Sequence, residues 1–223
     1  MNTNHAQTAM KIDWRDIRFA LVLGIVTIFL KMVTFYIPSW HFSRTTGDIA
    51  LTTFTVGYIL ARARRMPHQL DQWGLTTVLT PAALLTGLSL LVFSVLVLAG
   101  LGFLIAGGFI FEPVYMAEMI EYIPAAFPQQ FVLCSVGLVS LASLSAFRGT
   151  WRLPLLVGAL FSLAHFWTPV RIPGTIVPVQ MLITLPAGAG AAWYFLRFRN
   201  ILPLTVIHAV LYPLMHHWIE RQL

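Results

Sequence analysis

Seven apolar segments, each near the length that crosses a lipid bilayer, follow one another along the chain. A helix needs about 20 apolar residues to cross the hydrocarbon layer, and only helices and closed barrels satisfy the backbone polar groups there. These segments are too long and too uniformly apolar for barrel strands. We therefore expect an all-α, polytopic membrane bundle of about seven or eight transmembrane helices. The segments are residues 17–38, 47–62, 81–107, 128–147, 153–168, 175–196 and 201–219.

Two of the boundaries leave alternatives open. The segment 81–107 is long enough either to tilt strongly or to break at Gly107 and Gly108. Residues 112–127 are amphipathic, and they either lie on the membrane surface or begin the fourth helix. Pro128 fits the first turn of that helix, where its missing N–H has little effect.

Composition places the protein in the membrane and excludes several functional classes. The chain is 58% hydrophobic and only 10% charged, whereas soluble domains carry about 25% charged residues. The net charge of +6 lies in short loops, as topology signals do, and does not predict nucleic-acid binding. The single cysteine, Cys134, excludes an internal disulfide framework. Residues 1–16 read as a polar tail without a cleavable signal peptide, and 17–223 as a single membrane domain.

The basic residues predict an orientation. With the N-terminus in the cytoplasm, ten basic residues lie inside and three outside, which satisfies the positive-inside rule. Lys31 falls within the first segment, where its side chain snorkels or faces the bundle. The inner residues are Lys11, Arg15, Arg18, Arg62, Arg64, Arg65, Arg148, Arg152, Arg197 and Arg199, and the outer ones are Arg44, Arg171 and Arg221.

Two histidines lie inside apolar segments, His165 in the fifth and His208 in the seventh. Ionisable side chains are costly in hydrocarbon and usually mark a functional cavity, although interhelical hydrogen bonding also explains single histidines. Phe161 shares a helix face with His165, and Tyr212 shares one with His208, because each pair is four residues apart. The depths of these segments predict a site between the membrane midplane and its outer half.

Three stretches resemble the motifs of the CPBP family, which contains CAAX prenyl endopeptidases and bacteriocin-processing or immunity proteins. They are FPQQFVLCSVGLVSL, LPLLVGALFSLAHF and WYFLRFRNILPLTVIHAVLYPL, and the resemblance covers about residues 120–216. The loop LDQWGLTT also resembles a family segment. The resemblance implies a glutamate-dependent intramembrane protease in a bacterial plasma membrane, with membrane lipid and a membrane-associated, lipidated or exported peptide as partners.

Only part of the catalytic pattern is present. Phe161 and His165 match the second motif and His208 the third, whereas Gln129 and Gln130 replace the glutamate pair. In addition, Cys134 stands at the arginine position and Tyr212 at the asparagine or aspartate position. A general base must accept a proton, and a glutamine amide has no useful basicity.

Several assignments of the chemistry remain open. A histidine could be the base, Glu118 or Glu121 could fold back over the site, or the glutamines could bind a peptide backbone. No cofactor is expected, because His165 and His208 are the only candidate metal ligands and catalytic zinc usually has three. The leading hypothesis is an intramembrane endopeptidase. The alternatives are an inactive relative that binds or protects against a membrane peptide and, less favoured, a transporter subunit.

Overall fold

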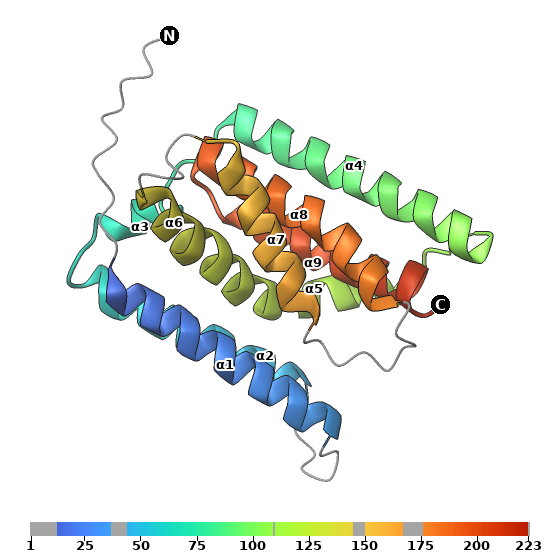
Figure 1. The fold of residues 1–223 in the computed structure, drawn as a ribbon, viewed down its shortest axis with the longest axis horizontal. Coiled ribbons are helices and arrows are strands. Elements are labelled where there is room, and N and C mark those ends of the chain that lie inside the picture. The colour runs from blue at the N-terminus through green and yellow to red at the C-terminus, as the bar shows by residue number, and fades with distance from the viewer. Residues whose placement is uncertain (1–12, 37–43, 109, 145–149, 167–175, 223) are drawn as a thin grey trace.

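The computed structural model of the chain describes residues 13–36, 44–108, 110–144, 150–166 and 176–222, and the regular elements in these ranges are all helical (Figure 1). The expected all-α class is therefore confirmed for these ranges. In chain order the elements are α1 (Trp14–Tyr36), α2 (Arg44–Ala63), α3 (Gln69–Gln72), α4 (Pro81–Ala106), α5 (Val114–Gln130), η2 (Phe131–Leu138), α6 (Val139–Ser143), α7 (Arg152–Phe166), α8 (Ile176–Phe198), α9 (Leu202–Met215) and η3 (His216–Glu220).

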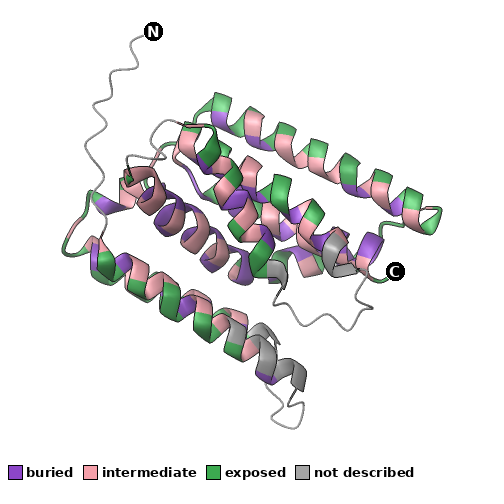
Figure 2. Ribbon diagram, viewed as in Figure 1, coloured by how far each residue is buried: buried purple, intermediate pink, exposed green. Residues whose placement is uncertain are grey.

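Three stretches of the described helices are long and apolar enough to cross a membrane: Pro81–Ala106, Val114–Ser143 and Val179–Phe198. The chain is accordingly an integral membrane protein, and the total of about seven crossings stays a prediction. Helix α4 lies along one edge of the molecule and α1 and α2 along the opposite edge, with α5 to α9 between them (Figure 1). Exposed residues recur along α1 and α4 (Figure 2), as expected for helices that contact lipid.

Both ends of α4 have local causes in the sequence. The Thr80 hydroxyl accepts a hydrogen bond from the Ala83 N–H at 3.1 Å, and Pro81 occupies the first turn. Gly107 ends the helix with φ +72°, a left-handed conformation that glycine adopts without a Cβ clash. The helix therefore ends at Gly107, where the sequence predicted a break.

The fourth transmembrane helix begins before the predicted boundary at residue 128, in agreement with the alternative in which residues 112–127 begin it. Helix α5 begins at Val114 and continues through η2 into α6, so Val114–Ser143 is one 30-residue helical segment. The amphipathic stretch therefore begins this helix. Pro128 lies in the helix interior and not in a first turn, and Gln129 and Gln130 lie near the middle of the segment.

A side chain from α2 compensates for Pro128. In an α-helix the carbonyl of residue 124 accepts from the N–H of residue 128, but a proline at 128 has no N–H to donate. The Thr52 hydroxyl contacts this Pro124 carbonyl as well as the Asp48 carbonyl of its own helix. The helix that carries the glutamines is thereby tied to α2.

Small residues bring α7 and α8 into close contact. A Cβ on Gly158 would lie 2.5 Å from the Leu185 carbonyl oxygen, and a Cβ on Gly188 would lie 2.8 Å from the Phe161 Cβ. Gly188 belongs to the run PAGAGAAW, in which glycine and alanine permit close helix packing. This run therefore serves packing within the chain.

The loop containing Trp73 and Gly74 is fixed against the core at the predicted inner end of the bundle. Trp73 is 1% exposed, its carbonyl accepts from the Ser135 hydroxyl at 2.7 Å, and its ring lies edge-on to Phe131. Gly74 has φ +69°, and a Cβ there would lie 2.7 Å from the Arg199 carbonyl oxygen. Only glycine fits this conformation and this close approach.

A buried polar cluster joins α1, α2 and α3 at the same end. The Asp16 carboxylate accepts from the Tyr58 hydroxyl, from Arg62 Nε at 3.1 Å and from Gln69 Nε2 at 2.9 Å. Arg62 also pairs with Asp13. Because Arg62 is only 5% exposed, this basic residue of the orientation pattern also holds helices together.

Candidate functional site

Gln130 and His208 meet between α5 and α9, near the middle of the long helical segment. Gln130 Nε2 lies 3.0 Å from His208 Nδ1. On the other side of the amide, the Cys134 thiol donates to Gln130 Oε1 at 3.7 Å. Gln130 is 4% exposed and Cys134 is fully buried. The three side chains form a short hydrogen-bonded chain that ends at the imidazole.

Aromatic rings enclose the imidazole of His208. Phe161 of α7 meets it edge-on with ring centroids 5.8 Å apart, and Tyr122 of α5 does so at 5.7 Å. Tyr122 also stacks on Tyr212 at 3.9 Å, and its hydroxyl accepts from Gln129 Nε2 at 3.2 Å. The two glutamines therefore differ: Gln130 contacts the histidine, and Gln129 contacts the tyrosine pair beside it.

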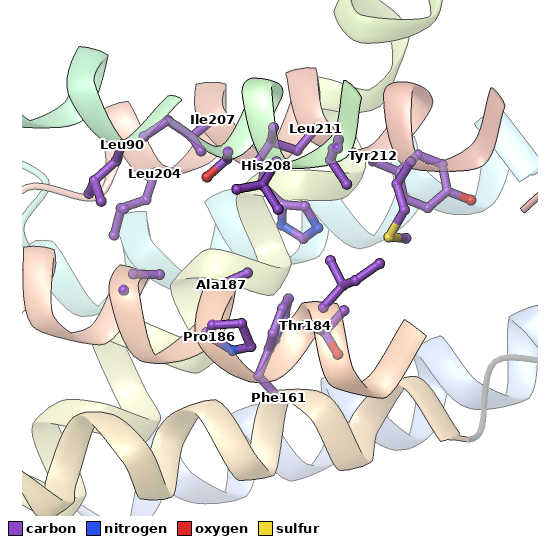
Figure 3. A pocket seen from close by; sticks show the side chains of 18 of the residues that line it. Leu90, Phe161, Thr184, Pro186, Ala187, Leu204, Ile207, His208, Leu211 and Tyr212 are labelled. Atoms are coloured by element: carbon purple, nitrogen blue, oxygen red, sulfur yellow. The ribbon is translucent and has the colours of Figure 1, made fainter. Parts of the chain in front are cut away.

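The imidazole lines an apolar cavity of about 230 Å³ between α4, α8 and α9, with Phe161 and Gln130 contributing from α7 and α5. Figure 3 shows the His208 ring pointing from α9 into this space, toward Phe161. Most of the lining is aliphatic or aromatic. The polar groups at its surface come from Ser94, Gln130, Thr184, His208 and Tyr212. A space of this kind suits an apolar segment that carries a few polar groups.

His165 lies in α7, one turn after Phe161. Its side chain lies outside the described residues, so the structure places its helix beside the cavity and leaves its contacts undefined.

The two candidate carboxylates are directed elsewhere. Glu118 contacts His217, with 2.6 Å between Glu118 Oε2 and His217 Nε2, and Glu121 is exposed. Glu118 precedes Gln130 by twelve residues, which is about 18 Å along a helix. Neither carboxylate therefore supplies a base beside Gln130 in this structure.

The sequence did not indicate two features of the site. Directly after Gln130 the helix widens into π-helical turns over Phe131–Leu138, a distortion that is frequent at functional sites. Tyr122 was also missed, although it lies seven residues before Gln129, a spacing that places two residues on one helix face.

Among the described residues, no group of three histidine, cysteine, aspartate or glutamate side chains is arranged to hold a metal ion. What the described site offers chemically is an imidazole, two amides and two phenols at the edge of an apolar space. These groups can donate and accept hydrogen bonds, and the imidazole alone among them can exchange a proton near neutral pH.

The fold and site define an all-helical integral membrane protein with a histidine and a glutamine side by side at an intramembrane cavity. Residues 126–212 match the family model described as type II CAAX prenyl endopeptidase Rce1-like, which is less than half of the chain. This match confirms the resemblance to the CPBP family and lies within the predicted core of about 120–216. No curated protein and no solved structure shows a significant match.

Proposed function

We propose that this chain acts, at the family level, as a CAAX-protease-type membrane peptidase on a membrane-associated peptide bound in the α4–α8–α9 cavity. The observation that carries the proposal is the place of His208: it lines the cavity and lies within the segment matched by the family model. The apolar lining suits a membrane-embedded segment, and the polar groups suit a peptide bond.

Hydrolysis would add water across a C–N bond. A base takes a proton from water, the carbonyl oxygen becomes anionic, and the leaving nitrogen takes a proton. Because Gln130 has no basicity, the base in this reading is a histidine, His165 or His208. Gln129, Gln130 and Tyr212 then bind the substrate by hydrogen bonds, and Phe161 holds the imidazole of His208 in place.

The contact between Gln130 and His208 favours a second candidate, a pseudoprotease that binds or protects against a membrane peptide without cleaving it. An amide next to the imidazole preserves hydrogen bonding but removes the carboxylate that the family uses to activate water. Both candidates require peptide in the same cavity, and they differ only in whether the bond breaks.

The charge pattern supports an orientation for either candidate. We infer a cytoplasmic N-terminus in a bacterial plasma membrane, since the helix ends with most basic residues lie together at the end of the bundle that carries α3. The middle position of Gln130 in its helix supports a site near the midplane. An exported or lipidated peptide would reach this depth from within the bilayer.

The test uses the full chain in lipid vesicles with a fluorescent peptide that carries one apolar segment of about 20 residues. Binding is read from fluorescence anisotropy, and cleavage from mass spectrometry. Variants His208→Ala and His165→Ala are compared with His68→Ala, an exposed loop histidine. Cleavage lost in the first two variants but kept in the third supports the peptidase. Saturable binding without cleavage supports the pseudoprotease, and absence of binding overturns both.

A further inference from the structure

We propose that Gln180 of α8 is a positioning residue for His165 of α7: its buried amide oxygen accepts a hydrogen bond from one imidazole nitrogen and so fixes the ring. The use of that ring in chemistry rests on the proposed function. The contact itself is argued from the way α7 and α8 pack and from an amide oxygen that lacks a donor.

The first observation is the oxygen of Gln180. The side chain is 5% exposed, and its Oε1 has no hydrogen-bond partner among the described residues. The oxygen is enclosed, so a water molecule does not reach it either. Buried amide oxygens without a donor are rare in native proteins, because the lost hydrogen bonds to water are not replaced. A donor is therefore expected from a neighbouring side chain of this chain.

The two hydroxyl groups near Gln180 have other acceptors. The Ser162 hydroxyl donates to the Met181 carbonyl at 2.7 Å, and the Thr184 hydroxyl donates to the backbone carbonyl of Gln180 at 2.8 Å. A hydroxyl has only one hydrogen to donate. These two groups therefore stabilise the backbone of α8 and do not supply the amide oxygen.

The register of α7 against α8 brings His165 to the level of Gln180. The two helices run in opposite directions, since Gly158 lies against Leu185 and Ser162 lies against Met181. Three residues beyond Ser162 on α7 correspond to a similar step back from Met181 on α8. The backbone of residue 165 is consequently beside the turn of α8 that carries Gln180.

The two residues also belong to the helix faces that meet. Phe161 is one turn before His165, and its Cβ would lie 2.8 Å from a Cβ on Gly188. Gly188 and Gln180 are eight residues apart, which places them on one face of α8. Thr184, between them, lines the cavity (Figure 3). The proposed hydrogen bond thus lies one helical turn beyond the cavity wall.

An amide oxygen in this place determines the proton on the ring. Because a carbonyl oxygen only accepts, the imidazole nitrogen that meets it carries the hydrogen. In a neutral ring the other nitrogen then has the lone pair. Under the proposed function this is the form of His165 that can take a proton from water. Gln180 acts through the histidine and needs no contact with the peptide.

The contact can be measured by solid-state NMR of the full chain in lipid, with ¹⁵N-labelled histidine and ¹³C-labelled glutamine. At about pH 8.5 the ordinary imidazole is neutral. The pair of Gln130 and His208, 3.0 Å apart, is the internal reference. We expect a second ¹⁵N–¹³C contact within about 4 Å, made by a protonated ring nitrogen and lost in His165→Ala. A His165 ring without this contact, or with an unprotonated nitrogen in it, overturns the proposal with no further variant.

A double-mutant cycle tests the same pair by stability. Gln180→Met removes the acceptor with little change of shape, so it should lower the melting temperature by about 2–4 °C, because the imidazole N–H is left unpaired. In a His165→Ala background the same change should be neutral or stabilising, since no donor remains to be lost. His68→Ala, at an exposed loop histidine, is the control background and should leave the loss unchanged. Equal effects of Gln180→Met in all three backgrounds contradict the pairing.

These outcomes are separate from those of the vesicle assay. If the contact of His165 and Gln180 is observed but no peptide binds, the positioning role stands and the proposed function fails. If peptide is bound or cleaved while the contact is absent, the proposed function stands and the inference fails.

Discussion

His217 Nε2 lies 2.6 Å from Glu118 Oε2, which ties the end of the chain to the first turns of α5. The imidazole also stacks on Tyr115 with ring centroids 4.1 Å apart, and Trp218 beside it donates to the Ile110 carbonyl at 2.8 Å. The last helix is therefore fastened at the end of the bundle opposite to the Trp73 loop. This fastening explains how polar residues are accommodated in the amphipathic start of α5.

Removing the carboxylate should loosen this end of the molecule. Because His217 is 6% exposed, its unpaired ring nitrogen in Glu118→Leu should lower the free energy of unfolding by about 1–3 kcal/mol. Glu118→Gln, which keeps a hydrogen-bonding group, should recover part of the loss, and Glu121→Leu at an exposed position should have little effect. Thermal unfolding in detergent measures all three. Equal losses for Glu118→Leu and Glu121→Leu would contradict the role of this pair.

Gly158→Ala should separate α7 from α8. The added Cβ would meet backbone at 2.5 Å, and neither helix can relieve this contact by rotating a side chain. We expect a loss of about 1–3 kcal/mol in the free energy of unfolding, together with weaker peptide binding, because Phe161 is displaced. Gly190→Ala in α8 is the matched control, since a Cβ added there would have nothing within 4 Å. Similar melting temperatures for the two variants would refute this account of the packing.

Thr52→Val should leave the Pro124 carbonyl without its donor from α2. The expected loss is about 0.5–1.5 kcal/mol, the usual net value of one hydrogen bond. Thr53→Val is the control, because the Thr53 hydroxyl donates to Ile49 within its own helix and the residue is exposed. Hydrogen exchange of the backbone amides around Pro124 and Gln130 should rise in the first variant alone. Unchanged exchange there would mean that α2 does not hold this helix.

Ala187→Phe should block the cavity. The phenyl ring projects from α8 into a space of about 230 Å³, so peptide affinity in the vesicle assay should fall by roughly tenfold or more. Leu182→Phe places the same ring on an outward position that is 74% exposed, and affinity there should stay within about twofold of wild type. Undiminished binding in Ala187→Phe would move the peptide site elsewhere.

Local sequence signals accounted for several features of the fold. Thr80, Pro81 and Gly107 define the ends of α4 by capping chemistry, which depends on neighbouring residues alone. The small residues around Gly188 likewise indicated close packing, although their partner on α7 became clear only in three dimensions.

The start of α5 was misplaced for a different reason. Rules based on apolar runs treat Glu118 and Pro128 as interruptions, because in isolation one is charged and the other breaks helices. Here the compensating groups are His217 and Thr52, which are 99 and 76 residues away in the chain. No window of sequence contains both members of such a pair, so this boundary required the tertiary structure.

The candidate site was predictable only in part. Gln130 and Cys134 are four residues apart, and the CPBP resemblance placed Gln130 and His208 in matching motifs. Which glutamine meets the histidine was not deducible, because Gln129 and Gln130 point to different sides of one helix and both fit the motif. The π-helical turns after Gln130 alter that geometry further.

The hydrogen bond from Thr52 to the Pro124 carbonyl matters for any attempt to move the family-matched segment into another protein. Both residues lie outside the stretch 126–212 that carries the family match, yet they support the helix that presents Gln130. The matched stretch is consequently not a self-sufficient module. A fragment or chimaera that keeps the motifs but replaces α2 must provide another hydroxyl at this carbonyl, or the helix that carries Gln130 will be less stable.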